Sequence, residues 1–120
     1  MINQKTDTFE NVTVTVRARR GADVWDEFEV KRKLPAAERA ANEYRVDKFV
    51  EFVTQTVSVE GLSFAWPTVG SSADAVNAAY AAWCDMTPNL MIKWANLIYD
   101  ANQPPLPDEN LIPGNEPSLP

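Results

Sequence analysis

Residues 71–102 read SSADAVNAAYAAWCDMTPNLMIKWANLIYDAN, and this stretch predicts two consecutive amphipathic helices. Ser71 or Ser72 can cap the first helix, because a serine side chain accepts a hydrogen bond from a free N–H of the first turn. Thr87 followed by Pro88 has the pattern of an N-cap and a first helical position. Apolar residues recur on one face of each helix: Val76, Ala79, Tyr80 and Trp83 in the first, and Leu90, Trp94, Leu97, Ile98 and Ala101 in the second. A short connection between such helices favours a helical hairpin.

Residues 11–34 predict an antiparallel β-hairpin. Val12, Val14 and Val16 alternate with polar residues, which is the period of two of a half-buried strand. Residues 20–23 (RGAD) supply a turn, and residues 24–33 alternate again, with Phe28 and Val30 on one face. In this arrangement, the arginines of the first strand would face the glutamates of the second.

The middle of the chain predicts less regular structure. Residues 36–44 (AAERAANEY) are rich in helix formers and predict a short helix after Pro35. Residues 49–53 have helical spacing, whereas residues 54–64 are β-branched with rough alternation. We expect a third strand at residues 52–59, and helix and strand both remain open for residues 45–60.

Length and composition favour one domain followed by a tail. The chain has 120 residues, of which 45% are hydrophobic, enough for one core. We expect a single α+β domain at residues 1–101, in which the N-terminal hairpin, with or without the third strand, packs with the C-terminal helical hairpin. Residues 102–120 contain six of the nine prolines and no Lys or Arg, so an extended or disordered flexible tail is expected there.

The charge distribution excludes some classes of partner. The net charge is −6, and residues 49–120 hold eight acids against Lys93 alone. A chain with this balance lacks the basic footprint of a nucleic-acid binder. No stretch approaches the ~20 apolar residues of a membrane span. The single cysteine, Cys84, favours a reducing compartment, and we expect it to be a buried, inert thiol.

The residues that most enzymes need are scarce. The chain has no histidine, and its four glycines are too scattered for a phosphate-binding loop. Asp74, Asp85 and Asp100 are the candidates for a site built only of carboxylates, but they lie at predicted helix ends, where solvated acids are common. We therefore predict a protein that is not an enzyme and that needs neither a cofactor nor a metal.

Large apolar side chains are the candidate protein-binding residues, because Trp and Tyr dominate the hot spots of protein interfaces. Most of those near the two C-terminal helices are expected to form the core instead. An exposed Trp25 or Trp66 would fit a binding surface best. The candidates are Trp25, Trp66, Tyr80, Trp83 and Trp94 in the domain, and Leu106 and Leu111 in the tail.

Residues 50–115 resemble the tail assembly chaperones of long-tailed bacteriophages. The resemblance is carried by the following segments: Val59-Glu60-Gly61-Leu62, Ala79-Tyr80-Ala81-Ala82-Trp83, Leu90-Met91-Ile92-Lys93-Trp94, and the exit Asn102-Gln103-Pro104-Pro105-Leu106-Pro107-Asp108 leading to Leu111-Ile112-Pro113. It implies a β-containing N-terminal part followed by small helices and a tail rich in proline and aspartate.

The same resemblance implies a role in the cytoplasm of the infected host. Such a protein binds the long tape measure protein, recruits tail-tube subunits around it, and is absent from the finished particle. It is often also made in a longer, frameshifted form, and the two products would diverge in the tail.

Three other functions fit the sequence. A structural virion protein, such as a tail or connector subunit, would be present in purified particles. An acidic anti-defence inhibitor would mimic nucleic acid towards a basic nuclease, and salt would weaken that binding steeply. A small carboxylate enzyme would depend on Asp74, Asp85 or Asp100.

Overall fold

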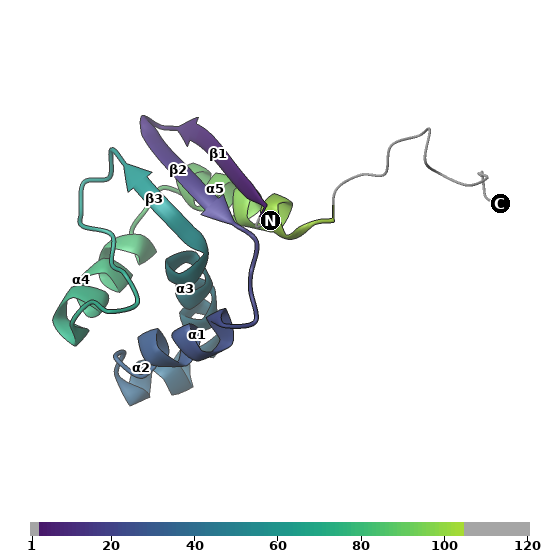
Figure 1. Ribbon diagram of the computed structural model, residues 1–120. Helices are drawn as coiled ribbons and strands as arrows, with labels where there is room; N and C mark the ends of the chain where they lie inside the picture. Colours follow the sequence, from purple (N-terminus) through teal and green to yellow (C-terminus); the bar gives the residue numbers. More distant parts are fainter. Residues whose placement is uncertain (1–2, 105–120) are drawn as a thin grey trace, which may run out of the picture.

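The computed structural model describes residues 3–104 (Figure 1). In chain order the elements are β1 (Gln4–Phe9), β2 (Val12–Arg17), α1 (Asp23–Lys31), α2 (Ala36–Ala41), α3 (Glu43–Gln55), β3 (Thr56–Glu60), α4 (Ala73–Cys84) and α5 (Pro88–Asn102). The expected α+β class is confirmed. Most of the predicted tail, including Leu106 and Leu111, lies outside the described residues.

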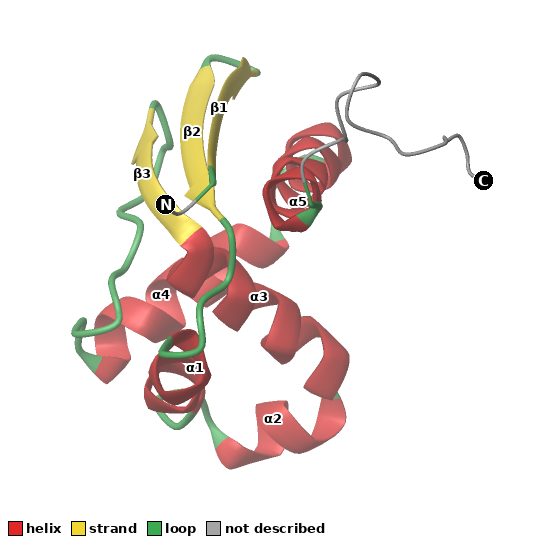
Figure 2. Cartoon of the chain, turned by 45° about the vertical axis from the view of Figure 1, so that its right-hand side comes forward, coloured by secondary structure: helices red, strands yellow, loops and turns green. Residues whose placement is uncertain are grey.

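The three strands form an antiparallel sheet in the order β1-β2-β3. Phe9 pairs with Val12 at the end of the first hairpin, so only Glu10 and Asn11 form the turn. Both have positive φ, 52° and 63°, as a two-residue turn of the primed type requires. Val12, Val14 and Val16 are buried, and α5 packs against β1 and β2 (Figure 2).

An N-terminal hairpin is present, but the strand predicted at residues 24–33 is wrong. That segment is helix α1, and the partner of β2 is β1. Phe28 is 61% exposed and Val30 is fully buried, because residues two apart in a helix point to nearly opposite sides. An alternating pattern that contains so few apolar residues cannot distinguish a strand from a helix. β1 escaped detection because Phe9 is its one buried residue.

Residues 45–60 contain both elements that the sequence left open. Helix α3 runs to Gln55, and β3 follows without a loop. The predicted third strand therefore exists, but it begins at Thr56 rather than at residue 52. Phe49, Phe52 and Val53 are buried on one side of α3, so the first half of the predicted strand follows the helical spacing.

The two C-terminal helices and their caps are confirmed, but α4 and α5 do not pack along each other as the predicted helical hairpin. The Ser72 side chain accepts a hydrogen bond from the Ala75 amide, and the Thr87 side chain accepts one from Leu90. The short helix after Pro35 is also present as α2. α5 packs on the sheet and on α3, whereas α4 buries its apolar face on the aromatic residues of α3.

An aromatic cluster joins helices α3, α4 and α5 and the loop after β3. The rings of Phe49 and Phe52 lie 5.1–5.4 Å from those of α4 and α5. Trp94 is fully buried, with its ring 4.7 Å from that of Trp66. Its indole N–H donates a hydrogen bond of 3.1 Å to the Thr56 hydroxyl. Trp94 thus joins α5 to α3, to β3 and to the loop after β3.

We expect Gly61→Ala to lower the free energy of unfolding by about 1–3 kcal/mol, the usual cost of a strained backbone. Gly61 has φ +95°, and a Cβ there would overlap the carbonyl oxygen of Asn11. Chemical denaturation checks this result. Gly21→Ala is the matched control and should have little effect, because a Cβ at Gly21 meets no atom within 4 Å. Equal effects of the two substitutions would contradict the close approach.

Candidate protein-interaction site

Most of the predicted binding aromatics belong to the core. Tyr80, Trp83 and Trp94 are 7%, 3% and 0% exposed. Trp66 is half-buried and packs against the same cluster. These four side chains therefore support the fold and offer little surface to a partner.

Trp25 is the exception, because it is 73% exposed on α1. Its ring centroid lies 6.2 Å from that of Phe28, which is also exposed. Residues three apart share one face of a helix, so the two rings form a small apolar surface, the Trp25–Phe28 patch.

A larger feature is the α3–α5 groove. It consists of two adjoining hollows of about 480 and 610 Å³ that share Lys48, Phe52 and Ala95. Its polar end is further lined by Arg19, Glu27, Glu51, Gln55, Ile98, Tyr99 and Asn102. Its apolar end is further lined by Tyr44, Arg45, Trp83, Cys84, Asp85 and Met91.

The apolar end has a rigid floor and a basic rim. Phe52 forms the floor, held between Trp83 and Trp94 at ring distances of 5.2 and 5.1 Å. Lys48 lies on the rim, with its ammonium 5.6 Å from the centre of the Tyr44 ring. This combination suits an apolar side chain whose neighbours carry negative charge.

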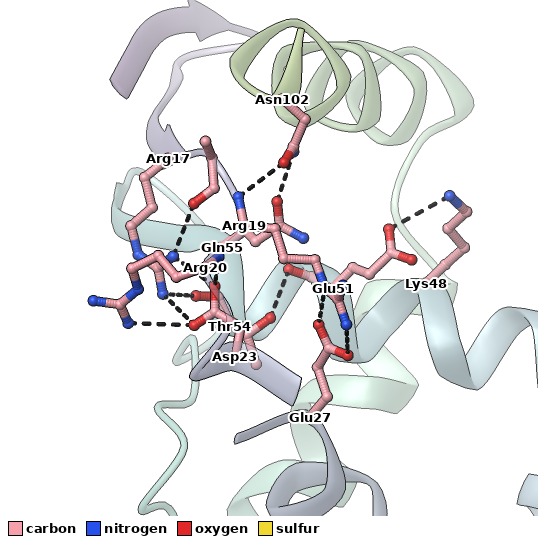
Figure 3. Close-up of polar contacts among 11 residues, drawn as sticks. Arg17, Arg19, Arg20, Asp23, Glu27, Lys48, Glu51, Thr54, Gln55 and Asn102 are labelled. Carbon is pink, nitrogen blue, oxygen red and sulfur yellow. Dashed lines mark hydrogen bonds and ion pairs between the residues drawn. The ribbon is translucent and has the colours of Figure 1, made fainter. Parts of the chain in front are cut away.

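Hydrogen bonds fix the polar end in place (Figure 3). Arg19 and Glu27 form a two-pronged ion pair, with both N–O distances 2.7 Å. Asn102, at the end of α5, accepts from the Arg19 amide at 2.8 Å and donates to buried Gln55 at 2.7 Å. The pairing of Arg19 with a glutamate was expected, although Glu27 lies on a helix rather than on a second strand.

Comparison of the chain with protein-family models, curated proteins and solved structures gives no match. The candidate site therefore depends on the geometry of this chain alone.

Beneath the polar end lies a buried ion pair. Asp23 is fully buried, and its carboxylate accepts two hydrogen bonds from the Arg17 guanidinium, at 2.7 and 2.9 Å. Arg17 also donates to the Thr54 carbonyl, so the pair joins the end of β2, the start of α1 and the end of α3 (Figure 3). Burial raises the pKa of the Asp23 carboxyl, but hydrogen bonds from Arg17 and the Arg20 amide outweigh it and hold the pKa at about 2.

Cys84 is exposed at the apolar end, so the expectation of a buried thiol is wrong. α4 turns its other face to the core, where Tyr80 and Trp83 lie. Partial desolvation by its neighbours still raises the pKa of the Cys84 thiol, although a hydrogen bond with Tyr80 opposes the rise. The thiol is therefore protonated at neutral pH and is a weak nucleophile.

The candidate acids for carboxylate chemistry are exposed and far apart in the chain. Asp74 lies in the first turn of α4, Asp85 follows its last residue, and Asp100 lies near the end of α5. Within residues 3–104, no three His, Cys, Asp or Glu side chains are grouped so that they could hold a metal ion. In the same range, no helix has the length and apolar character required to cross a membrane.

The groove was not found from the sequence. Tyr44, Lys48 and Phe52 are spaced by four residues and so share one face of α3, and Met91 and Ala95 do the same on α5. The first series would have been visible if residues 43–55 had been interpreted as one helix. That the two faces lie opposite each other depends on the packing of α5, which local patterns do not specify.

Proposed function

We propose that this protein is a non-catalytic binding factor that holds an amphipathic segment of a client protein in the α3–α5 groove. The observation that carries the proposal is the apolar floor at Phe52 and Met91 beneath the basic rim of Arg45 and Lys48. Helix-in-groove recognition uses such a floor, on which apolar side chains of the client helix dock.

Charge supports a client segment with acidic residues beside its apolar face. Arg45 is exposed and forms no ion pair with any residue of the described range. Lys48 lies 3.5 Å from Glu51, and both side chains are partly exposed, so this contact is weak and easily exchanged. A client carboxylate can therefore pair with either cation at little cost.

We further propose that the binding serves the assembly of a bacteriophage tail. The support for this is the resemblance of residues 50–115 to tail assembly chaperones, whose client is the tape measure protein. In that role the protein acts in the host cytoplasm and brings tail-tube subunits to the client. The Trp25–Phe28 patch, on another helix, then offers a second surface for the subunits.

Affinity purification from cells that produce the phage tests this role. The tagged protein should recover a very long, helix-rich protein from the lysate, identified by mass spectrometry, and the tagged chain should be missing from purified particles. A fixed stoichiometry inside particles would make the protein a structural subunit instead. Recovery of a basic nuclease in its place would indicate an anti-defence inhibitor.

Substitutions in the groove should reduce recovery of this client about tenfold, which corresponds to roughly 1.4 kcal/mol. Lys48→Glu reverses the charge on the rim, and Met91→Ala removes apolar contact from the floor. Their matched controls are Lys93→Glu and Ile92→Ala, at exposed α5 positions that line neither hollow. Quantitative mass spectrometry of the purified complexes measures the effect. Equal losses in both pairs would argue against the groove as the binding site.

A further inference from the structure

We propose that the C-terminal segment Asp108–Pro113 of this chain occupies the apolar end of the α3–α5 groove. Leu111 and Ile112 then contact Phe52 and Met91, and Asp108 and Glu109 approach the basic rim. The chain thus covers its own binding site, and a client must displace this segment. Only the competition with a client rests on the proposed function, because the docking is a property of the chain alone.

The segment starts close to the groove. Tyr99 and Asn102 line the polar end, and Pro104 is two residues further on. An extended chain covers at most about 3.3–3.6 Å per residue, so Leu111 can lie up to about 24 Å from Pro104. Ala95 and Met91 lie only about 10 and 16 Å back along α5 from Asn102, at 1.5 Å per residue. The linker is therefore long enough to place Leu111 on the floor.

The chemistry of the segment matches that of the groove. Residues 108–112 read DENLI, which is two acids, one asparagine and two aliphatic residues in that order. The apolar end has a basic rim at Arg45 and Lys48, with Asp85 as the one acid of its lining, and an apolar floor at Phe52 and Met91. Residues 105–120 contain three acids and no Lys or Arg, so no cation within this segment can pair with its acids.

Covalent attachment to the same chain strengthens such a contact. A tethered segment acts at an effective concentration near the millimolar range for a short flexible linker. A contact too weak to bind as a free peptide can therefore fill the groove for most of the time. A tightly binding client still displaces it.

Paramagnetic relaxation in the full-length protein tests the docking. A nitroxide is attached to Asn115→Cys in a chain that also carries Cys84→Ser, because Cys84 lines the groove and is the sole native cysteine. Amide signals of Lys48, Phe52 and Ala95 should lose most of their intensity, and the loss should decrease with distance from the apolar end. Broadening spread evenly over the domain would overturn the proposal.

Two controls make the result specific. The pair Leu111→Ser and Ile112→Ser in the same labelled chain should restore the groove signals, and unchanged broadening would overturn the assignment of these residues. Mixing labelled chains with isotope-enriched, unlabelled chains separates the two possible sources of the segment. Broadening in that mixture would show that a second copy supplies it and would contradict docking within one chain.

Client recovery then tests the competition separately. The variant with Leu111→Ser and Ile112→Ser should recover several-fold more client than the natural chain. If the groove signals respond as expected but no client is recovered from any variant, the proposed function fails and the docking stands. If client is recovered equally by both chains, the competition is wrong.

Discussion

Replacing Asp23 with alanine is expected to lower the free energy of unfolding by about 3–5 kcal/mol, the usual cost of breaking a buried ion pair from one side. The side chain is fully buried, and Arg17 beside it is 13% exposed. Without the carboxylate, the guanidinium keeps its contact with the Thr54 carbonyl but loses its counter-charge. Urea denaturation of the variant, compared with the natural chain, measures the loss.

Two further variants separate this effect from general damage. Arg17→Met combined with Asp23→Leu should be less destabilising than Asp23→Ala, because no unpaired charge remains buried. Arg32→Ala breaks the exposed pair with Glu29 and should cost less than about 1 kcal/mol. If the double variant were the least stable of the three, the unpaired charge would not be the cause.

Acid should remove part of the same stabilisation in the natural chain. The folded-state pKa of Asp23 is about 2, below the ordinary value of 3.8 for an aspartate. The Asp23 carboxylate therefore stabilises the fold fully above its unfolded-state pKa. This stabilisation is lost as the pH falls through the folded-state pKa. A shift of this size corresponds to about 2 kcal/mol. The natural chain should therefore lose about 2 kcal/mol of its free energy of unfolding between pH 4 and 2 through Asp23, and the Asp23→Ala variant should not show this loss.

Trp94→Ala is expected to lower the free energy of unfolding by about 3–5 kcal/mol, as for other large aromatic residues removed from a core. The side chain is fully buried, and its ring contacts those of Phe52 and Trp66. The substitution also leaves the Thr56 hydroxyl without its donor. Because Trp94 holds α5 against the sheet and α3, the α3–α5 groove should loosen as well. Denaturation together with amide exchange of α5 measures both effects.

The controls for this substitution come from the same chain. Trp94→Phe keeps a ring in the core and should cost clearly less than the alanine variant. Trp25→Ala removes the same number of atoms from an exposed position and should change stability by less than about 0.5 kcal/mol. A comparable loss at both tryptophans would contradict the burial that separates them.

The C-terminal half of the fold was predictable because its signals are local. Ser72 and Thr87 cap their helices within three residues, and the apolar faces of α4 and α5 follow a helical period over several turns. β1 and α1 were missed for the opposite reason. β1 is an edge strand with one buried residue, and α1 buries only Asp23 and Val30.

The candidate site was less predictable than the fold. The large apolar side chain of a tryptophan suits both a core and an interface, so Trp83 and Trp94 stayed candidates for binding although the core was the favoured interpretation. In the structure, the rings of Trp83 and Trp94 pack against the ring of Phe52. The surface of the proposed groove includes Lys48, Met91 and Ala95, which have no unusual local pattern and come together only after α3 and α5 pack.

The two ends of the described chain are in contact, because the Asn3 side chain donates a hydrogen bond of 2.9 Å to the Ala101 carbonyl. Helix α5 also covers β1 and β2. During synthesis the apolar face of the sheet, with Val14 and Val16, must therefore wait for the last helix to emerge from the ribosome. Contacts between residues so distant in the chain form late in folding. One wall of the proposed groove belongs to α5, so the groove is complete only after α5 has been made. In the proposed function, client binding therefore requires a chain that extends through α5, and shorter nascent chains do not compete for the client.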